Sequence, residues 1–134
     1  MQSFKYIKNW FRIKKLKKLL EQESNRITQE KQSEKYKALS AEEKEHVDQT
    51  IWDEYRMLDE DLEGILTEQL KREAVKYKIP IPYKWKNKDY EKYWEQDFLG
   101  LSDYLSPEGY HKLRKDIREE RKARRDETLS WVPL

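Results

Sequence analysis

Apolar side chains recur at intervals of three and four residues through the first third of the chain, which is the spacing of one helix face. No Gly or Pro interrupts residues 3–38, so the pattern predicts one long helix there. Its apolar stripe runs through Ile13, Leu16, Leu20 and Ile27. Beyond Ile27 the residues are nearly all polar, and we expect this second half of the helix to be a solvent-facing extension or to fray.

A second long helix is expected from about Ala41 to Lys78. Ser40 followed by Glu43 is a capping-box pattern, in which each side chain accepts from the backbone N–H of the other residue. The apolar stripe of this helix is formed by Val47, Ile51, Tyr55, Leu58, Leu62 and either Ile65 or Leu66. Its intervals resemble those of a coiled-coil seam. The two helices together therefore predict a long, coiled-coil-like helical hairpin.

Proline ends the second predicted helix, because Pro80 and Pro82 push the residues before them out of the α region. The segment 79–105 that follows is rich in Tyr and Trp. We expect an irregular, extended stretch there that wraps over the hairpin, with a short helix near residues 90–96. Its aromatic side chains are interpreted mainly as packing that holds the segment on the helices, and a ligand cage or stacking surface is the alternative.

A third helix is predicted toward the end of the chain. Ser106 suits the N-cap position and Pro107 the first turn, and the helix is expected to reach about Thr128. The predicted fold class is all-α. Its parts are a long helical hairpin (1–78), an aromatic connecting segment (79–105) and a basic C-terminal helix (106–134).

Composition narrows the possible classes of protein. Charged residues make up 42% of the 134 residues, against about 25% in a typical domain. Hydrophobic residues reach only 36%, so a large globular core is difficult to build. The five Trp and nine Tyr argue against plain disorder, because such side chains are costly to leave in water. The absence of cysteine excludes disulfides and thiolate chemistry.

Catalytic and metal-binding patterns are not found in the sequence. His46 and His111 lie on different predicted helices, and no glycine-rich phosphate loop is present. The acids at 59–64 resemble the start of a calcium loop, but the twelfth position, which requires a bidentate Glu, is Leu70. We therefore expect no enzyme activity, no metal site and no cofactor.

Charge is segregated along the chain. Residues 1–20 contain seven Lys or Arg and no acid, and residues 41–75 contain twelve acids and four bases. Residues 112–125 contain eight bases and three acids. Either the basic ends fold back onto the acidic middle, or they meet an external anion.

The N-terminal segment combines bases with aromatic side chains. A basic amphipathic helix of this kind binds an anionic membrane surface or a partner groove. It also suits the phosphates of a nucleic acid, with aromatic rings stacking on unpaired bases. The alternative is that the apolar stripe is one side of the hairpin core. The candidate contact residues are Lys5, Lys8, Trp10, Phe11, Arg12, Lys14, Lys15, Lys17 and Lys18.

The last predicted helix is Arg-rich and ends in apolar residues with a Trp, as in the lead-in to a membrane, where Lys and Arg collect on the cytoplasmic side. Its candidate contact residues are Arg121, Lys122, Arg124, Arg125 and Trp131. No run of about 18 apolar residues is present, so the hydrophobic spans would have to follow Leu134. The alternative is that Trp131 packs back on the helices.

Motifs in the last third of the chain resemble a group of small bacterial proteins with a long helical hairpin and C-terminal transmembrane helices. These motifs are Ile-Pro-Ile-Pro at 79–82, Tyr-Trp-Glu at 93–95, Tyr-Leu-Ser-Pro-Glu-Gly at 104–109, Leu-Arg-Lys-Asp-Ile-Arg-Glu-Glu-Arg at 113–121 and Ser-Trp-Val-Pro-Leu at 130–134. The first 78 residues match in architecture only. Some members of the group look like the membrane-spanning effectors of retron antiphage systems. The transmembrane helices themselves are absent from this sequence.

The resemblance implies a cytosolic helical domain at the inner face of the bacterial inner membrane. It also implies a protein partner, namely a reverse transcriptase with its RNA–DNA hybrid that holds the effector inactive. The anionic membrane surface is the other expected partner. Two alternatives remain open: a soluble helical adaptor or coiled-coil homo-oligomer with no membrane link, and a nucleic-acid binder that uses the basic N-terminal helix.

Overall fold

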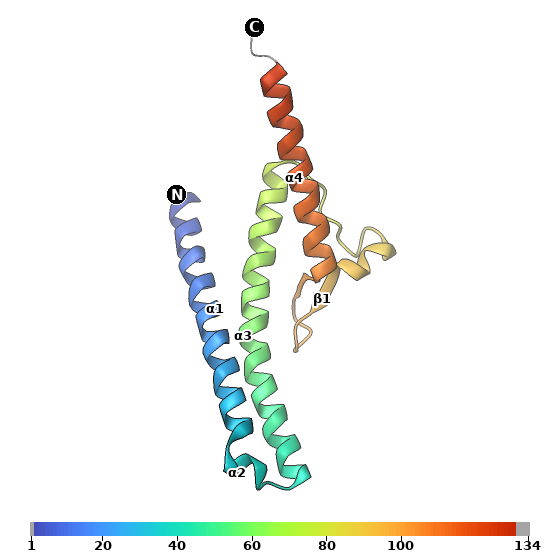
Figure 1. The fold of residues 1–134 in the computed structure, drawn as a ribbon. Coiled ribbons are helices and arrows are strands. Elements are labelled where there is room, and N and C mark those ends of the chain that lie inside the picture. The colour runs from blue at the N-terminus through green and yellow to red at the C-terminus, as the bar shows by residue number, and fades with distance from the viewer. Residues whose placement is uncertain (1, 131–134) are drawn as a thin grey trace. The chain divides into compact units, whose positions relative to one another are not determined.

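The computed structural model describes residues 2–130, and it describes side chains for residues 7–129. The elements in chain order are α1 (Gln2–Gln32), α2 (Glu34–Lys37), α3 (Ala41–Lys76), the 3₁₀ helix η1 (Lys88–Tyr93), β1 (Trp94–Gln96), β2 (Asp103–Leu105) and α4 (Pro107–Ser130) (Figure 1). The described chain is thus mostly helical, in agreement with the predicted all-α class. The two short strands were not predicted.

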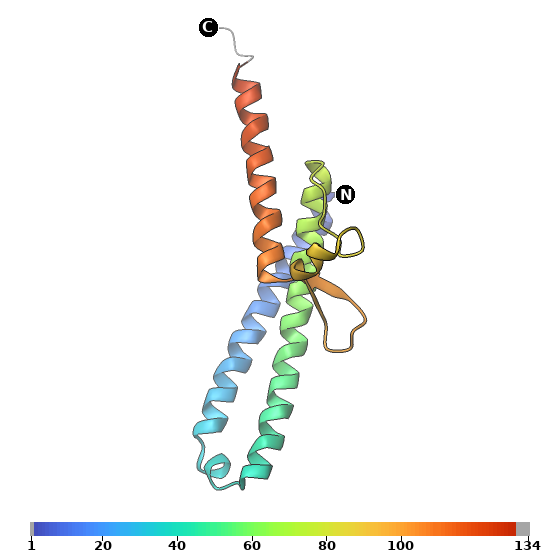
Figure 2. The ribbon, with the colours of Figure 1, turned by 90° about the vertical axis from the view of Figure 1, so that its right-hand side faces the viewer.

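The chain forms two compact units, Met1–Ile65 and Leu66–Leu134, and the division between them falls within α3. In the first unit, α1 and the first part of α3 run side by side in opposite directions (Figures 1 and 2). Leu16 and Leu20 of α1 and Ile51 and Leu62 of α3 are buried. These residues belong to the two predicted apolar stripes, which therefore mark the buried sides of the helices.

The long helix predicted over residues 3–38 is interrupted at Ser33. The Ser33 side chain accepts a hydrogen bond from the backbone N–H of Tyr36 and donates one to the carbonyl of Glu30. Serine competes in this way with the helical backbone, so α1 ends and α2 begins. The Tyr36 hydroxyl then donates to Asp48 at 2.8 Å. Residues 28–37 are exposed or half-buried, as expected of a solvent-facing extension, and the helix is interrupted at Ser33.

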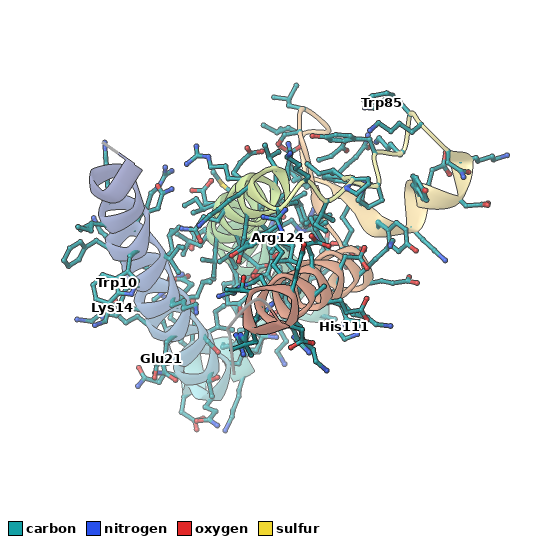
Figure 3. All side chains as sticks on the ribbon, turned by 90° about the horizontal axis from the view of Figure 1, so that it is seen from above. Trp10, Lys14, Glu21, Trp85, His111 and Arg124 are labelled. Atoms are coloured by element: carbon teal, nitrogen blue, oxygen red, sulfur yellow. The ribbon has the colours of Figure 1, made fainter. Side chains whose placement is uncertain are left out.

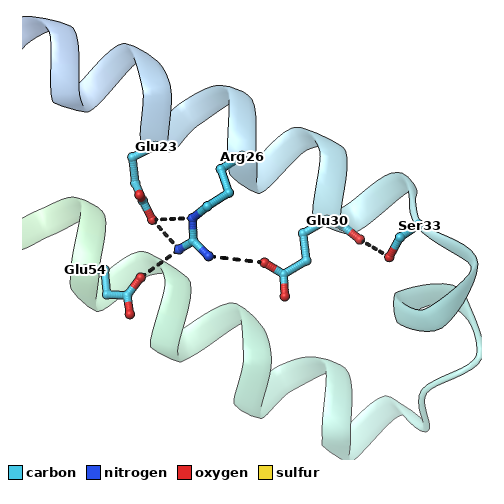
Figure 4. A network of polar contacts seen from close by, with 5 residues as sticks. All are labelled: Glu23, Arg26, Glu30, Ser33 and Glu54. Atoms are coloured by element: carbon cyan, nitrogen blue, oxygen red, sulfur yellow. Dashed lines mark hydrogen bonds and ion pairs between the residues drawn. The ribbon is translucent and has the colours of Figure 1, made fainter.

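Arg26 carries the main polar network of the first unit (Figure 4). Its guanidinium binds Glu23 on the same helix, and it reaches Glu54 of α3 at 2.7 Å. Glu30 lies 3.7 Å from the same group. The hydrogen bond from Arg26 lowers the pKa of Glu23. Exposed ion pairs stabilise a fold only weakly, so this network chiefly selects the alignment of α1 with α3.

The predicted start of α3 is confirmed. The backbone N–H of Glu43 donates to the Ser40 hydroxyl at 3.2 Å, and the N–H of Ser40 donates to the Glu43 carboxylate at 3.4 Å. The far end of α3 is closed by a Schellman motif. Ile79 N–H donates to the carbonyl of Ala74, and Lys78 takes the left-handed conformation, with φ 57°. The helix thus ends just before the prolines.

The second unit has its own core. Its buried members come from α3, from α4 and from the segment between them, and they are Leu70, Ala74, Ile81, Leu105, Leu113 and Ile117. Tyr77, Tyr83 and Trp94 pack against this cluster. Part of the aromatic segment therefore packs on helices, as predicted.

A two-stranded antiparallel hairpin occupies the segment where only a short helix was expected. Trp94 pairs with Leu105 and Gln96 with Asp103. The predicted helix near residues 90–96 was wrong in part, because the 3₁₀ helix ends at Tyr93 and the chain then becomes extended. A buried hydrogen bond from the N–H of Leu105 to the hydroxyl of Thr67 ties β2 to α3.

The predicted N-cap of α4 is confirmed. The Ser106 hydroxyl accepts from the N–H of Gly109 at 3.1 Å and donates to the carbonyl of Lys92 at 2.8 Å. It therefore caps α4 and fixes the end of η1 at the same time. Gly109 is required here because a Cβ at this position would lie 2.2 Å from the carbonyl oxygen of Tyr93.

Candidate functional site: the outer face of α1

The side of α1 opposite its buried stripe carries both aromatic and basic side chains. Leu16 and Leu20 face the interior of the first unit, and at about 100° per residue the positions opposite them fall near 7, 11, 14 and 18. We call this surface the outer face of α1. It consists of Ile7, Trp10, Phe11, Lys14, Lys15 and Lys18.

Trp10 and Phe11 form an exposed aromatic pair on this face. Their rings meet edge to face with 4.9 Å between centroids, and they are 50% and 61% exposed. The Lys14 ammonium lies 4.8 Å from the centre of the Trp10 ring, and Figure 3 shows both side chains on the same side of α1. Ile7 and Phe11 are both more than half exposed, so they are not part of the hairpin core.

The cations around this pair are in water. Lys8, Arg12, Lys15 and Lys17 are exposed, as are Lys14 and Lys18. Among the described residues, none of these six side chains forms an ion pair within 4.0 Å, and the first acid of α1 is Glu21. The outer face is thus a surface of uncompensated positive charge. The side chain of Lys5 lies outside the described residues.

The basic residues predicted in α4 divide into two kinds. Arg121 lies 3.5 Å from Glu73, and Arg124 donates to the carbonyl of Tyr77 at 3.1 Å. Both guanidinium groups also lie within 6 Å of the centre of the Tyr77 ring. Arg121 and Arg124 therefore hold α4 against the end of α3 within the second unit.

Lys122 and Arg125 are exposed on the same helix. Trp131 lies outside the described residues. The candidate residues of α1 and α4 belong to different compact units, so the outer face of α1 forms a candidate site by itself.

Two exposed surfaces of the second unit lie in the aromatic connecting segment, for which a ligand cage or stacking surface was the alternative interpretation. One is Trp85, which is 75% exposed. The other is the turn between the strands, where Phe98, Leu99 and Leu101 are exposed. This turn is held by the Asp97 carboxylate, which accepts from the N–H of Leu101. The exposure of this turn was not predicted, although the apolar residues on both sides of Gly100 were a sequence signal for it.

Among the described residues, no cluster of side chains that could bind a metal ion is found. His46 lies in the first unit and His111 in the second, and no group of three or more His, Asp or Glu side chains in this part of the chain is placed to hold a metal ion. Among the helices that the structure describes, none combines the length and the apolar character needed to cross a bilayer. In comparisons with protein-family models, curated proteins and solved structures, no match to this chain is found.

Proposed function

We propose that this chain is a non-enzymatic helical interaction domain that docks on an anionic membrane surface through the outer face of α1. The observation that carries the proposal is the exposed Trp10–Phe11 pair on a helix segment that bears six exposed cations and no acid. The hairpin does not use this face for its own packing.

The chemistry of the face matches the headgroup layer of a bilayer. Trp favours the interface because its ring is apolar and its N–H needs a polar partner. Lysines near an anionic leaflet contribute about 1 kcal/mol each, and their long stems let the ammonium groups reach phosphate oxygens. Because Leu16 and Leu20 are committed to the hairpin, the contact would be shallow, with aromatic rings at headgroup depth.

The resemblance described above supplies the cellular setting of this proposal. In that setting the chain is the cytosolic domain of a small bacterial membrane protein of antiphage defence, located at the inner face of the inner membrane. A reverse transcriptase with its RNA–DNA hybrid would be the partner that controls it. The coiled-coil-like hairpin and the basic C-terminal helix would then present surfaces to that partner and to the membrane.

Vesicle flotation tests the docking step. The full chain is expected to float with vesicles of phosphatidylcholine and phosphatidylglycerol. With vesicles of phosphatidylcholine alone it should remain in the bottom fraction of the gradient. Recovery should fall as salt is raised, because the contact is electrostatic. The double variant Lys14→Gln, Lys18→Gln should lose most of the bound fraction, since it removes two cations from the outer face.

Matched controls separate the outer face from net charge. Lys35→Gln, Lys37→Gln removes the same charge from exposed positions of the first unit and should float like the parent chain. Trp10→Ala should weaken binding, and Trp52→Ala, at another exposed Trp of the same unit, should not. Equal recovery on neutral and anionic vesicles, or equal loss in both lysine pairs, would contradict the proposal.

A further inference from the structure

Three aromatic rings of the second unit lie nearly parallel. The ring of Tyr83 stacks with Trp85 at 5.4 Å between centroids and 15° between planes. It also stacks with Trp94 at 5.8 Å and 8°. We call Trp85, Tyr83 and Trp94 the aromatic ladder. It offers flat surfaces that share one orientation.

The inner members of the ladder are fixed by the fold. The Trp94 indole N–H donates to the carbonyl of Pro82 at 2.8 Å, and Trp94 itself belongs to β1. Tyr83 packs on the core cluster, and its backbone N–H donates to the carbonyl of Ile81. The two inner rings are therefore preorganised and do not have to become ordered on binding, which lowers the free-energy cost of association.

Trp85 is the member of the ladder that faces water. It is 75% exposed, whereas Tyr83 and Trp94 are half-buried. Figure 3 shows Trp85 on the outside of the connecting segment. An indole that is stacked on one parallel ring and is otherwise largely in water is available to stack with a second flat group.

Positive charge surrounds the ladder. The segment 76–92 contains six lysines and two acids. The Lys86 ammonium lies 5.3 Å from the centre of Trp85, and the Lys71 ammonium lies 5.5 Å from that of Tyr83. Lys84 is paired with Asp103, but Lys86 and Lys88 form no ion pair with any described residue. The two lysines that follow Trp85 in the sequence therefore carry charge that no described acidic side chain neutralises.

We infer that the aromatic ladder is a stacking platform for single-stranded nucleic acid, in which an unpaired base lies on Trp85 and the flanking phosphates meet Lys86 and Lys88. Proteins that bind single strands without sequence preference combine exposed aromatic faces with basic grooves. The lysines would repel a cationic ligand, and a neutral sugar would offer no negative charge to pair with them. In a duplex the bases stack on one another, so their faces are not accessible to the Trp85 ring.

This inference is independent of the proposed membrane docking, because the two sites use different residues in different units. It predicts that nucleic-acid binding depends on Trp85, Lys86 and Lys88. Substitutions on the outer face of α1 should leave the stacking contribution unchanged. A dependence on Trp10 in place of Trp85 would assign nucleic-acid binding to α1 and overturn the inference.

Fluorescence anisotropy with a labelled oligothymidylate and the full chain tests the platform at low salt. Trp85→Ala should weaken binding about fivefold to a hundredfold, which is the range measured for the loss of one base–aromatic stack. Trp85→Phe should retain much of the affinity, because Phe keeps a flat face. Trp52→Ala is the matched control at an exposed Trp of the other unit, and it should bind like the parent chain.

Two further ligands separate stacking from simple attraction between charges. An abasic oligonucleotide of the same length should bind the parent chain more weakly than oligothymidylate and should be insensitive to Trp85→Ala. The corresponding duplex should behave like the abasic ligand. Lys86→Gln, Lys88→Gln should lower the salt dependence, because fewer counterions are released on binding. Equal affinity for abasic and normal strands, or no binding of either, would overturn the inference.

Discussion

The backbone N–H of Leu105 donates a hydrogen bond of 2.9 Å to the hydroxyl of Thr67, and both residues are buried. They lie 38 positions apart in the sequence. This bond fixes the last residue of β2 on α3 of the same unit. Thr67 interrupts the apolar face of α3, and the hydrogen bond explains why a polar side chain stands there.

Thr67→Val should therefore destabilise the second unit by about 1–3 kcal/mol, because Val fills the same space but leaves the buried N–H of Leu105 without an acceptor. Thr67→Ser keeps the hydroxyl and loses one methyl group, so it should cost only about 1 kcal/mol. Urea unfolding followed by circular dichroism measures both. A valine variant as stable as the parent chain would show that the hydrogen bond contributes nothing.

Alanine should have opposite effects at two glycines. At Gly109 the new Cβ would meet the backbone of Tyr93 at 2.2 Å, so Gly109→Ala should destabilise the chain by about 1–3 kcal/mol or more. At Gly64, within α3, nothing lies within 4 Å of the new Cβ, and Gly64→Ala should stabilise it by about 1 kcal/mol. Thermal unfolding of the two variants, compared with the parent chain, gives the sign of each change.

Arg124 should act as a structural residue of the second unit. Arg124→Gln removes the hydrogen bond to the Tyr77 carbonyl and the contact with the Tyr77 ring, and we expect a loss of about 1 kcal/mol. Arg125→Gln removes the same charge one position later and should change stability by less than about 0.5 kcal/mol. Denaturant unfolding distinguishes the two. Equal effects would mean that only the charge of α4 matters.

The turn between the strands should respond to acid through Asp97. Hydrogen bonds from the Ser102 hydroxyl and from backbone N–H groups, chiefly that of Leu101, lower the pKa of this carboxyl in the folded chain. A lowered pKa adds stability above the unfolded-state pKa, and this stability is lost as the pH falls through the folded-state pKa. A carbon-detected NMR titration should give a value below that of an ordinary aspartate. Ser102→Ala should raise the pKa of Asp97. An unchanged pKa in this variant would show that the Ser102 hydroxyl is not the main cause of the shift.

The helices were predictable from local signals. Ser40 with Glu43, and Ser106 with Pro107, are short-range patterns, and the side chains make the expected capping bonds. Ser33 was missed because a serine within a polar helix gives the same sequence pattern whether or not its side chain caps a new turn.

The strands could not be predicted in the same way. Each has three residues, too few for an alternating pattern, and β2 is positioned by Thr67 from a distant part of the chain. The turn at Asp97 to Gly100 did have a signal, since Asp at the first position and Gly at the fourth are typical of a turn.

The candidate site was predicted as a set of residues, but not as a geometry. In α1, Leu16 and Leu20 define the buried side of the helix, so Phe11 and Lys18 share the outer face. For α4, no local pattern could show that Arg121 and Arg124 contact Tyr77, since that contact depends on how α3 ends.

The exposed turn between β1 and β2 has a practical consequence for work in solution. Phe98, Leu99 and Leu101 present apolar surface to solvent on a tight, well-bonded loop. We therefore expect the protein to self-associate at high concentration through this turn, independently of any association through the hairpin of the first unit. A Leu99→Ser, Leu101→Ser variant should reduce this self-association and give a more monodisperse sample for crystallisation.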